Sequence, residues 1–275
     1  MKITASQVNE LRKATGAGMM DCKKALQEAE GDMQAAVEIL RKKGQKVAAK
    51  RSDRDAAEGV VIARSTEDGK RAAMIVLNCE TDFVAKNEDF AKVADTILAT
   101  AINENPSNLD ELKGLSFGDT GLKIEEKILE EIGKIGEKIE LSSYETVNAE
   151  KAFAYNHPGN KLAAIVGFNQ PAGEDVAKDV AMQVAAMAPV AVTPDEIPAD
   201  VIEKEKEIAR DLAIQEGKPA EMADKIAVGR LNKWFKEAAL MEQAFIKDNK
   251  KSIKQYLNDT NDGLAVTEFR RIALG

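Results

Sequence analysis

The sequence predicts an α+β protein with an N-terminal three-helix module, a duplicated α+β core of two related subdomains and a protruding antiparallel helical hairpin. Three observations support this prediction. Helical patterns with stop signals recur within the first 44 residues, and a strand–turn–strand–helix order occurs twice in the middle of the chain. Two charged helical patterns joined by a Gly-Lys-Pro turn follow near residues 195–240. A chain of 275 residues is long enough for two or three domains.

The N-terminal module is indicated by helix start and stop signals. Thr4 and Gln7 form a capping-box pattern, and Gly16 is expected to end this first helix. A second helix covers "MMDCKKALQEAE". Asp32 is a natural N-cap for the third helix, and Gly44 is expected to end it.

The segment "GQKVAAKRSDRDAAEG" is polar and basic and is interpreted as a linker, so the first domain is placed at residues 1–55. The lysines and arginines of this segment could contact the phosphates of a nucleic acid. However, no aromatic residues interleave to stack on bases, which favours a solvated linker.

The first core subdomain is placed at residues 56–145. Two strand-like runs flank Asp68–Gly69, a strong hairpin turn signal, and a helix is expected from about Glu88 to Asn103. A further helix is predicted from isoleucines at helical spacing, namely Ile124, Ile128, Ile132, Ile135 and Ile139.

The second core subdomain is placed at residues 146–275 because the same order of elements returns. "AEKAFAYNHPGNKLAAIVGFN" resembles "AEGVVIARSTEDGKRAAMIVLN" in strand, turn and strand, and similar helical patterns follow both segments. The C-terminal "FIKDNKKSIKQYL" and "GLAVTEFRRIAL" predict a helix and an apolar strand.

The two copies differ at the junction between the second strand and the helix. Ten residues lie between Asn78 and Asp89 in the first copy, but only five lie at the equivalent place in the second. Asp82 and Phe83 fall within this excess, where binding residues are often found. Phe83 could fill a gap between sheet and helix, or it could be presented to a partner with Asp82 accepting hydrogen bonds. Both interpretations stay open at this point.

The helical hairpin is inserted at about residues 195–240. Its apolar stripes are Val201, Ile208 and Leu212 on the first helix and Met222, Ile226 and Trp234 on the second. Because the other faces are densely charged, these stripes are expected to pair the two helices in a hairpin that protrudes from the core.

Composition favours a cytoplasmic protein with no membrane-spanning segment. The net charge of −8 argues against binding of polyanions by the whole molecule. Cys22 and Cys79 are far apart and lack a C-x-x-C partner, which argues against a disulfide framework or zinc site and suits a reducing compartment. The N-terminus has no apolar region typical of a signal peptide.

The sequence offers little for catalysis. His157 is the only histidine and lies in the turn "NHPGN", where a solvated surface residue is the favoured interpretation. No phosphate-loop, nucleophile-elbow or EF-hand pattern is present. We therefore predict no catalytic residue, no metal ligand and no cofactor. An enzyme that uses His157, and a helical adaptor or nucleic-acid binder, remain as alternatives.

Two segments, "LRKATGAGMMDCKKAL" at 11–26 and "LNCETDFVAKN" at 77–87, closely resemble the signature segments of bacterial elongation factor Ts. The resemblance covers nearly the whole chain. It implies a guanine nucleotide exchange factor that binds elongation factor Tu·GDP, disturbs its magnesium and phosphate site, and promotes GDP release so that GTP can bind. Asp82 and Phe83, within Thr81–Val84, match the family residues that enter the G domain of Tu near its magnesium site.

The resemblance also implies further contacts with Tu. It makes the N-terminal module ubiquitin-associated-like in fold and assigns it the contact residues Arg12, Thr15, Gly16, Met19, Met20 and Asp21. In the core it assigns Ile135, Gly136 and His157. The pattern departs from the family at Val76, where glutamate is usual, and at Ala244, where a proline is lost.

The expected partner is elongation factor Tu, without direct nucleic-acid binding. The role of the hairpin is left among three options, which are homodimer formation, contact with Tu and bracing of the core.

Overall fold

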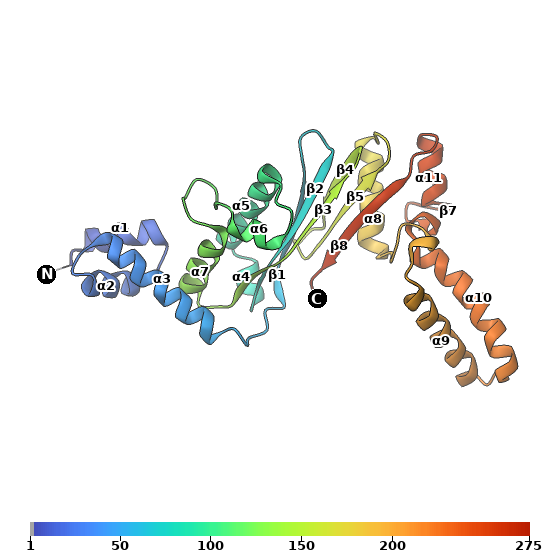
Figure 1. The fold of residues 1–275 in the computed structure, drawn as a ribbon, viewed down its shortest axis with the longest axis horizontal. Coiled ribbons are helices and arrows are strands. Elements are labelled where there is room, and N and C mark those ends of the chain that lie inside the picture. The colour runs from blue at the N-terminus through green and yellow to red at the C-terminus, as the bar shows by residue number, and fades with distance from the viewer. Residues whose placement is uncertain (1–2) are drawn as a thin grey trace.

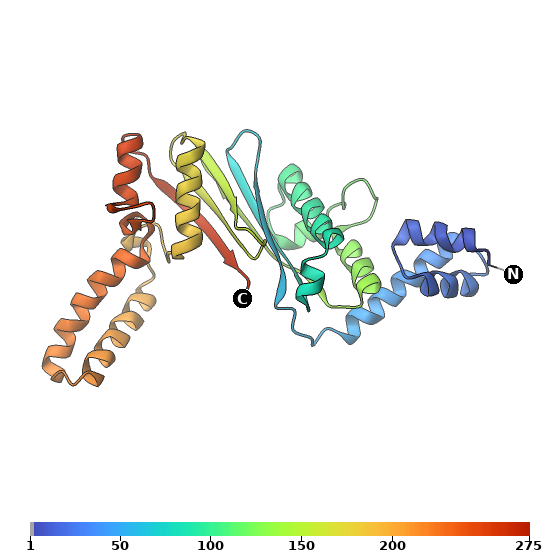
Figure 2. The ribbon, with the colours of Figure 1, turned by 180° about the vertical axis from the view of Figure 1, so that it is seen from behind.

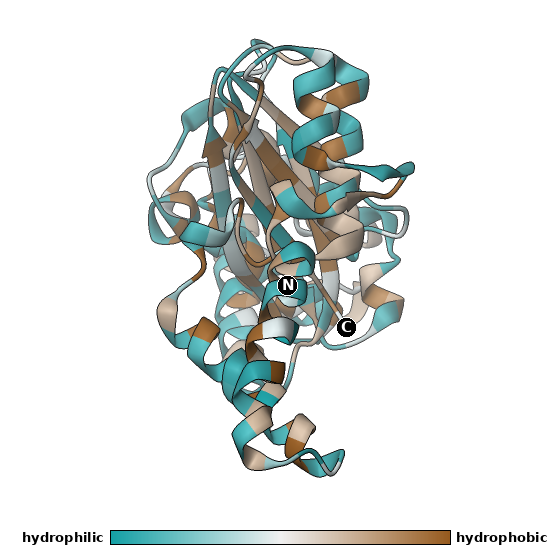
Figure 3. Ribbon diagram, turned by 90° about the vertical axis from the view of Figure 1, so that its right-hand side faces the viewer, coloured by the Kyte–Doolittle hydropathy of each residue, from teal (hydrophilic) through white to brown (hydrophobic). Residues whose placement is uncertain are grey.

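The computed structural model describes residues 3–275 and has an elongated α+β architecture (Figure 1). A helical module and a pair of long helices lie at opposite ends, with two β-sheets between them. The view from behind shows helices on the outer side of each sheet (Figure 2). Hydrophobic residues concentrate on the strands (Figure 3). Within residues 3–275, no helix combines the length and apolar character required to cross a membrane.

The N-terminal module consists of α1 (Ala5–Thr15), α2 (Met19–Glu28) and the first part of α3 (Met33–Lys50). The predicted caps are confirmed. Thr4 and Gln7 form a reciprocal capping box, Gly16 ends α1 at φ 68°, and Asp32 caps α3 through the N–H of Ala35. A small core of its own, which includes Leu11, Cys22 and Leu26, holds the three helices together.

The predicted end of the third helix at Gly44 is wrong. α3 continues to Lys50, so much of the expected linker is helical. Gly44 instead lies where α3 crosses α7 (Ile124–Ile135). Glycine permits either a left-handed helix cap or a close approach of two backbones. Gly44 serves the close approach of α3 to α7.

The first sheet has the strand order β1-β2-β3, all antiparallel, with β1 (Glu58–Ser65), β2 (Arg71–Cys79) and β3 (Ile139–Asn148). The hairpin turn is confirmed, with Gly69 at φ 65°. Every residue of β2 is buried, since α5 (Glu88–Glu104) packs on the outer face of the sheet and the second sheet covers the other.

Two details of this subdomain differ from expectation. The isoleucine pattern is helical only as far as Ile135, because Gly136 ends α7 at φ 81° and Ile139 begins β3. β3 itself runs to Asn148, past the boundary predicted at residue 145. The polar stretch before α7 contains the short helix α6 (Leu109–Gly114), whose Leu112 is buried.

The second unit repeats the order of the first. β4 (Lys151–Asn156), β5 (Leu162–Phe168) and β8 (Val266–Ala273) form an antiparallel sheet in the order β4-β5-β8, and α8 (Glu174–Met187) covers it. Residues of both sheets form a shared cluster between them, which includes Val61, Met74, Val147, Ala163 and Ile165. The two units therefore share a hydrophobic cluster where their sheets face each other.

The remaining elements lie on the outer side of the second unit. They are η1 (Pro194–Glu196), η2 (Leu240–Glu242), the short strands β6 (Ala244–Phe245) and β7 (Asp248–Ser252), and α11 (Ile253–Thr260). Gln183 of α8 is fully buried and hydrogen-bonds to Gln243, to the carbonyl of Ala244 and to the N–H of Ile246. This network fastens the segment to α8.

The long helices α9 (Ala199–Gln215) and α10 (Ala220–Ala238) run side by side and extend away from the sheets (Figure 1). The predicted stripes are buried only in part, since Val201, Ile226 and Trp234 are half-buried. The buried residues are alanines, namely Ala209, Ala213, Ala223 and Ala227, whereas Ile208, Leu212 and Met222 are exposed. Small side chains permit the two helices to pack closely, and Ile208, Leu212 and Met222 then lie outside the seam.

Candidate partner-binding site

Phe83 lies on an exposed single-turn helix between β2 and α5. This helix, α4 (Asp82–Ala85), occupies the extra residues of the first copy. The side chain of Phe83 is 83% exposed, so the interpretation that it fills a gap in the core is wrong. Val84 and Ala85 instead pack against the first core cluster. The turn is thus anchored from below while its aromatic ring faces solvent.

Thr81, at the N-terminus of α4, is held by Glu137. The N–H of Thr81 donates to Oε2 of Glu137 at 3.0 Å, and its hydroxyl donates to Oε1 at 2.7 Å. Glu137 follows directly on Gly136, which ends α7. Ile135 and Gly136 are therefore brought beside the Phe83 turn. No local pattern in the sequence marks Glu137 as part of this site.

Glu80 forms a second anchor for the same turn. Both of its carboxylate oxygens accept from Nη1 of Arg51, at 2.8 and 2.9 Å, and Oε1 also accepts from the N–H of Lys138 at 2.6 Å. The hydrogen bond from Lys138, followed by that from Arg51, lowers the pKa of Glu80. The sequence places Arg51 in a solvated linker, but in the structure this side chain binds Glu80, the residue before Thr81.

Cys79 lies beneath the turn and is fully buried. Its thiol donates to the carbonyl of Thr81 at 3.2 Å. Burial, and then the negative charge of Glu137, raise the pKa of Cys79 to about 12. The other cysteine, Cys22, is also fully buried.

Asp82 forms an ion pair with Lys86 one helical turn away, with 2.6 Å between Oδ2 and Nζ. The hydrogen bond from Lys86 lowers the pKa of Asp82 and raises that of Lys86. The side chain of Asp82 is 41% exposed. A partner can therefore replace Lys86 at low cost, because exposed pairs of this kind contribute little to stability.

His157 lies in the exposed turn between β4 and β5, as predicted. Its Nδ1 is 3.0 Å from the hydroxyl of Tyr155. The same turn docks on the first sheet, since the carbonyl of Asn160 accepts from the N–H of Val61 at 2.7 Å. Lys161 pairs with Glu58 at 2.7 Å, and its charge contributes to the lowered pKa of Asp82. The turn and α4 therefore lie on the same side of the core.

The N-terminal module presents a second exposed apolar feature at the turn between α1 and α2. Met19 and Met20 are 54% and 61% exposed. The hydroxyl of Thr15 donates to the carbonyl of Leu11 at 2.8 Å, and Asp21 pairs with Lys43 at 2.6 Å, which fixes both sides of the turn. Arg12 and Gly16 are exposed beside it. These residues lie apart from α4, at the far end of α3 (Figure 1).

The part of the chain that the structure describes, residues 3–275, contains no group of three or more His, Cys, Asp or Glu side chains that could hold a metal ion. The fold and the site together define an α+β protein that displays an aromatic side chain on a firmly anchored turn. Exposed aromatic residues on rigid scaffolds are typical of partner-binding surfaces.

Comparison with known proteins identifies the family. The family described as elongation factor Ts matches residues 80–275. Elongation factor Ts of Amoebophilus asiaticus is 50% identical over the full length of both chains. The proteins of the same name from Christiangramia forsetii and Porphyromonas gingivalis are 50% and 47% identical, covering all of this chain and 99% of theirs. The chain belongs to the elongation factor Ts family, and it is thus a translation elongation factor.

Proposed function

We propose that this chain is the guanine nucleotide exchange factor of elongation factor Tu. In this proposal it binds Tu·GDP, disturbs the magnesium and phosphate site with the Phe83 turn, and promotes GDP release so that GTP can bind. The observation that carries the proposal is the exposure of Phe83 on a turn whose neighbours Glu80, Thr81 and Val84 are all held by the core.

Such a turn favours exchange for an energetic reason. A ligand weakens GDP binding only if it binds nucleotide-free Tu better than GDP-bound Tu, and this coupling is reciprocal. Burial of a phenylalanine contributes about 1.5–3 kcal/mol, which corresponds to roughly ten- to a hundredfold in affinity. Because the turn is already ordered, little of this gain is lost to conformational entropy on binding.

One side chain is not enough for a larger weakening, so other surfaces contribute in this proposal. The ubiquitin-associated-like N-terminal module would contact the G domain through Met19 and Met20, with Arg12, Thr15, Gly16 and Asp21 around them. Ile135, Gly136 and His157 would make further contacts from the side of the core that carries α4. Asp82 would accept hydrogen bonds from Tu in place of Lys86. No covalent step is assigned to this chain.

We also propose that the hairpin of α9 and α10 forms a homodimer contact. Ile208 and Leu212 are one helical turn apart on α9 and are both exposed, which gives a continuous apolar strip that the intramolecular alanine seam does not use.

The exchange proposal is tested by stopped-flow measurement of the release of a fluorescent GDP analogue from purified Tu. Wild type should accelerate release strongly, and Phe83→Ala should lose roughly ten- to a hundredfold of that effect. Phe83→Leu should retain part of it because an apolar side chain remains. Ile246→Ala removes an exposed apolar side chain elsewhere on the surface and serves as the matched control.

The substitution is informative because Phe83 is exposed, so Phe83→Ala should change the free energy of unfolding by less than about 0.5 kcal/mol. Acceleration that survives in Phe83→Ala would show that exchange does not depend on this side chain. A wild-type chain without any effect on GDP release would disprove the proposed function.

A further inference from the structure

We infer that α3 is a rigid strut that fixes the spacing between the two surfaces assigned above to Tu, with Gly44 and Gly133 as its positioning residues. The effect of α3 on nucleotide exchange rests on the proposed function, whereas the geometry of α3 does not. α3 begins within the N-terminal module and ends beside the Phe83 turn, so a single helix connects both surfaces. α3 includes residues 44–50, the first part of the segment that the sequence predicts to be a linker.

The strut is fixed at a crossing of α3 with α7 where two glycines meet. A Cβ added to Gly44 would lie 2.5 Å from the carbonyl oxygen of Leu129, and one added to Gly133 would lie 3.0 Å from the Cα of Gly44. Gly44 cannot accept a side chain unless the helices move apart, because the atoms it would meet belong to the backbone. A side chain at Gly133 would require a smaller shift, of a few tenths of an ångström. The crossing therefore admits one close arrangement of module and core.

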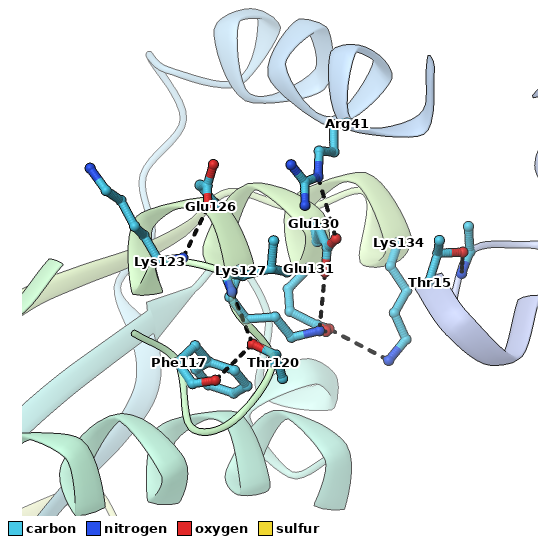
Figure 4. Close-up of polar contacts among 12 residues, drawn as sticks. Thr15, Arg41, Phe117, Thr120, Lys123, Glu126, Lys127, Glu130, Glu131 and Lys134 are labelled. Carbon is cyan, nitrogen blue, oxygen red and sulfur yellow. Dashed lines mark hydrogen bonds and ion pairs between the residues drawn. The ribbon is translucent and has the colours of Figure 1, made fainter. Parts of the chain in front are cut away.

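A long ion pair joins α3 to α7 on the module side of the crossing (Figure 4). Nε of Arg41 on α3 lies 3.9 Å from Oε1 of Glu130 on α7. Glu131, whose side chain is almost completely buried, lies 3.1 Å from Nζ of Lys127 and 3.5 Å from Nζ of Lys134. The aliphatic part of Lys134 in turn reaches Gly16, since a Cβ there would lie 3.2 Å from its Cδ. The turn after α1 is thus supported by α7.

The other end of the strut is attached to the Phe83 turn. Arg51, immediately after α3, binds both carboxylate oxygens of Glu80. Nζ of Lys138 donates to the carbonyls of Ser52 and Arg54, each at 3.2 Å, and ties the following residues to the start of β3. α3 therefore contacts the core both at its crossing with α7 and at its C-terminal end.

A fixed spacing has a consequence for a partner that contacts both surfaces. When one surface is bound, a rigid connection presents the other at high effective concentration, and a loose connection reduces that concentration. We therefore expect the strut to favour insertion of the Phe83 turn once the module has bound to Tu. Loss of the strut should then lower the maximal rate of GDP release.

The geometry is tested in the full chain with spin labels on Glu10→Cys in α1 and Lys92→Cys in α5, both exposed positions. Cys22 and Cys79 are buried and stay unlabelled. Pulsed electron paramagnetic resonance should give one narrow distance distribution for the otherwise unchanged chain. Gly44→Ala should shift or broaden it, and Gly133→Ala should do so to a smaller extent. Gly229→Ala, in the middle of α10, is the matched control because an added Cβ there meets no described heavy atom within 4 Å.

The same glycine variants, without labels, are compared in GDP release from Tu. Gly44→Ala should lower the maximal rate by about tenfold, and Gly133→Ala, whose closest contact is longer, supplies a milder variant that folds if Gly44→Ala does not. A distance distribution unchanged in both variants, or one that broadens while the maximal rate stays at the wild-type value, would overturn the inference. If the wild-type chain does not accelerate release at all, the proposed function fails, and the distance measurement still decides whether the strut exists.

Discussion

Glu137 accepts two hydrogen bonds from Thr81, one from its N–H at 3.0 Å and one from its hydroxyl at 2.7 Å. The residues are far apart in sequence, and this contact joins the end of α7 to the start of α4. Thr81 is followed directly by Asp82 and Phe83, so the position of the exposed ring depends on a carboxylate from another element.

Removing this carboxylate should loosen the turn. We expect Glu137→Ala to lower the free energy of unfolding by about 1–2 kcal/mol, because hydrogen bonds to a charged group are among the stronger ones. Amide exchange of Thr81 should become faster by about tenfold. Glu140→Ala, at a more exposed position on β3, should change neither quantity. Equal exchange rates at Thr81 in wild type and Glu137→Ala would contradict the anchoring role.

The anchor at Glu80 should depend on pH in a defined direction. The pKa of Glu80 is lowered from 4.5 in the fold, by the N–H of Lys138 and then by Arg51. A carboxylate whose pKa is lowered in the fold stabilises the fold at pH values above its unfolded pKa. This contribution is lost as the pH falls through the folded pKa.

An NMR titration of the Glu80 carboxyl group should therefore give a midpoint below 4.5. Arg51→Gln should raise the midpoint, whereas Lys50→Gln, which removes a neighbouring exposed cation, should leave it close to the wild-type value. A wild-type midpoint at or above 4.5 would contradict the contacts described for this carboxylate.

Cys79 should be unreactive in the folded protein. With its pKa raised to about 12, almost none of the thiol is ionised at neutral pH, and the side chain is fully buried. Iodoacetamide should therefore label it only after unfolding, as measured by mass spectrometry. Glu137→Ala should speed the labelling, because it removes both a support of the turn and a negative charge that raises this pKa. Rapid labelling of the native wild-type chain at Cys79 would be inconsistent with this arrangement.

The exposed strip on α9 should mediate association of two copies. We expect concentration-dependent dimerisation in sedimentation velocity, and we expect Leu212→Ser to weaken it. The substitution should change the free energy of unfolding by less than about 0.5 kcal/mol, because Leu212 is 46% exposed. Val190→Ser, at an equally exposed site outside the hairpin, is the control. A chain that stays monomeric at all concentrations would disprove the homodimer contact.

The sequence alone determined the features that depend on neighbouring residues. The caps at Thr4 and Asp32, the turn at Gly69, and the repeated order of strands and helices all follow from local hydrogen bonds and periodicity. The signature segments indicated the family, and the longer junction around Phe83 directed attention to the exposed turn.

Only the tertiary structure decided what depends on contacts between distant residues. Gly44 was expected to end a helix, but its lack of a side chain serves the approach of α7. Leu212 was expected in the hairpin seam, but alanines pack there more closely. Glu137 carries no local signal, because its partner Thr81 lies on another element. Local patterns specify the conformation of a segment, whereas the atoms that it meets are fixed only when the whole chain packs.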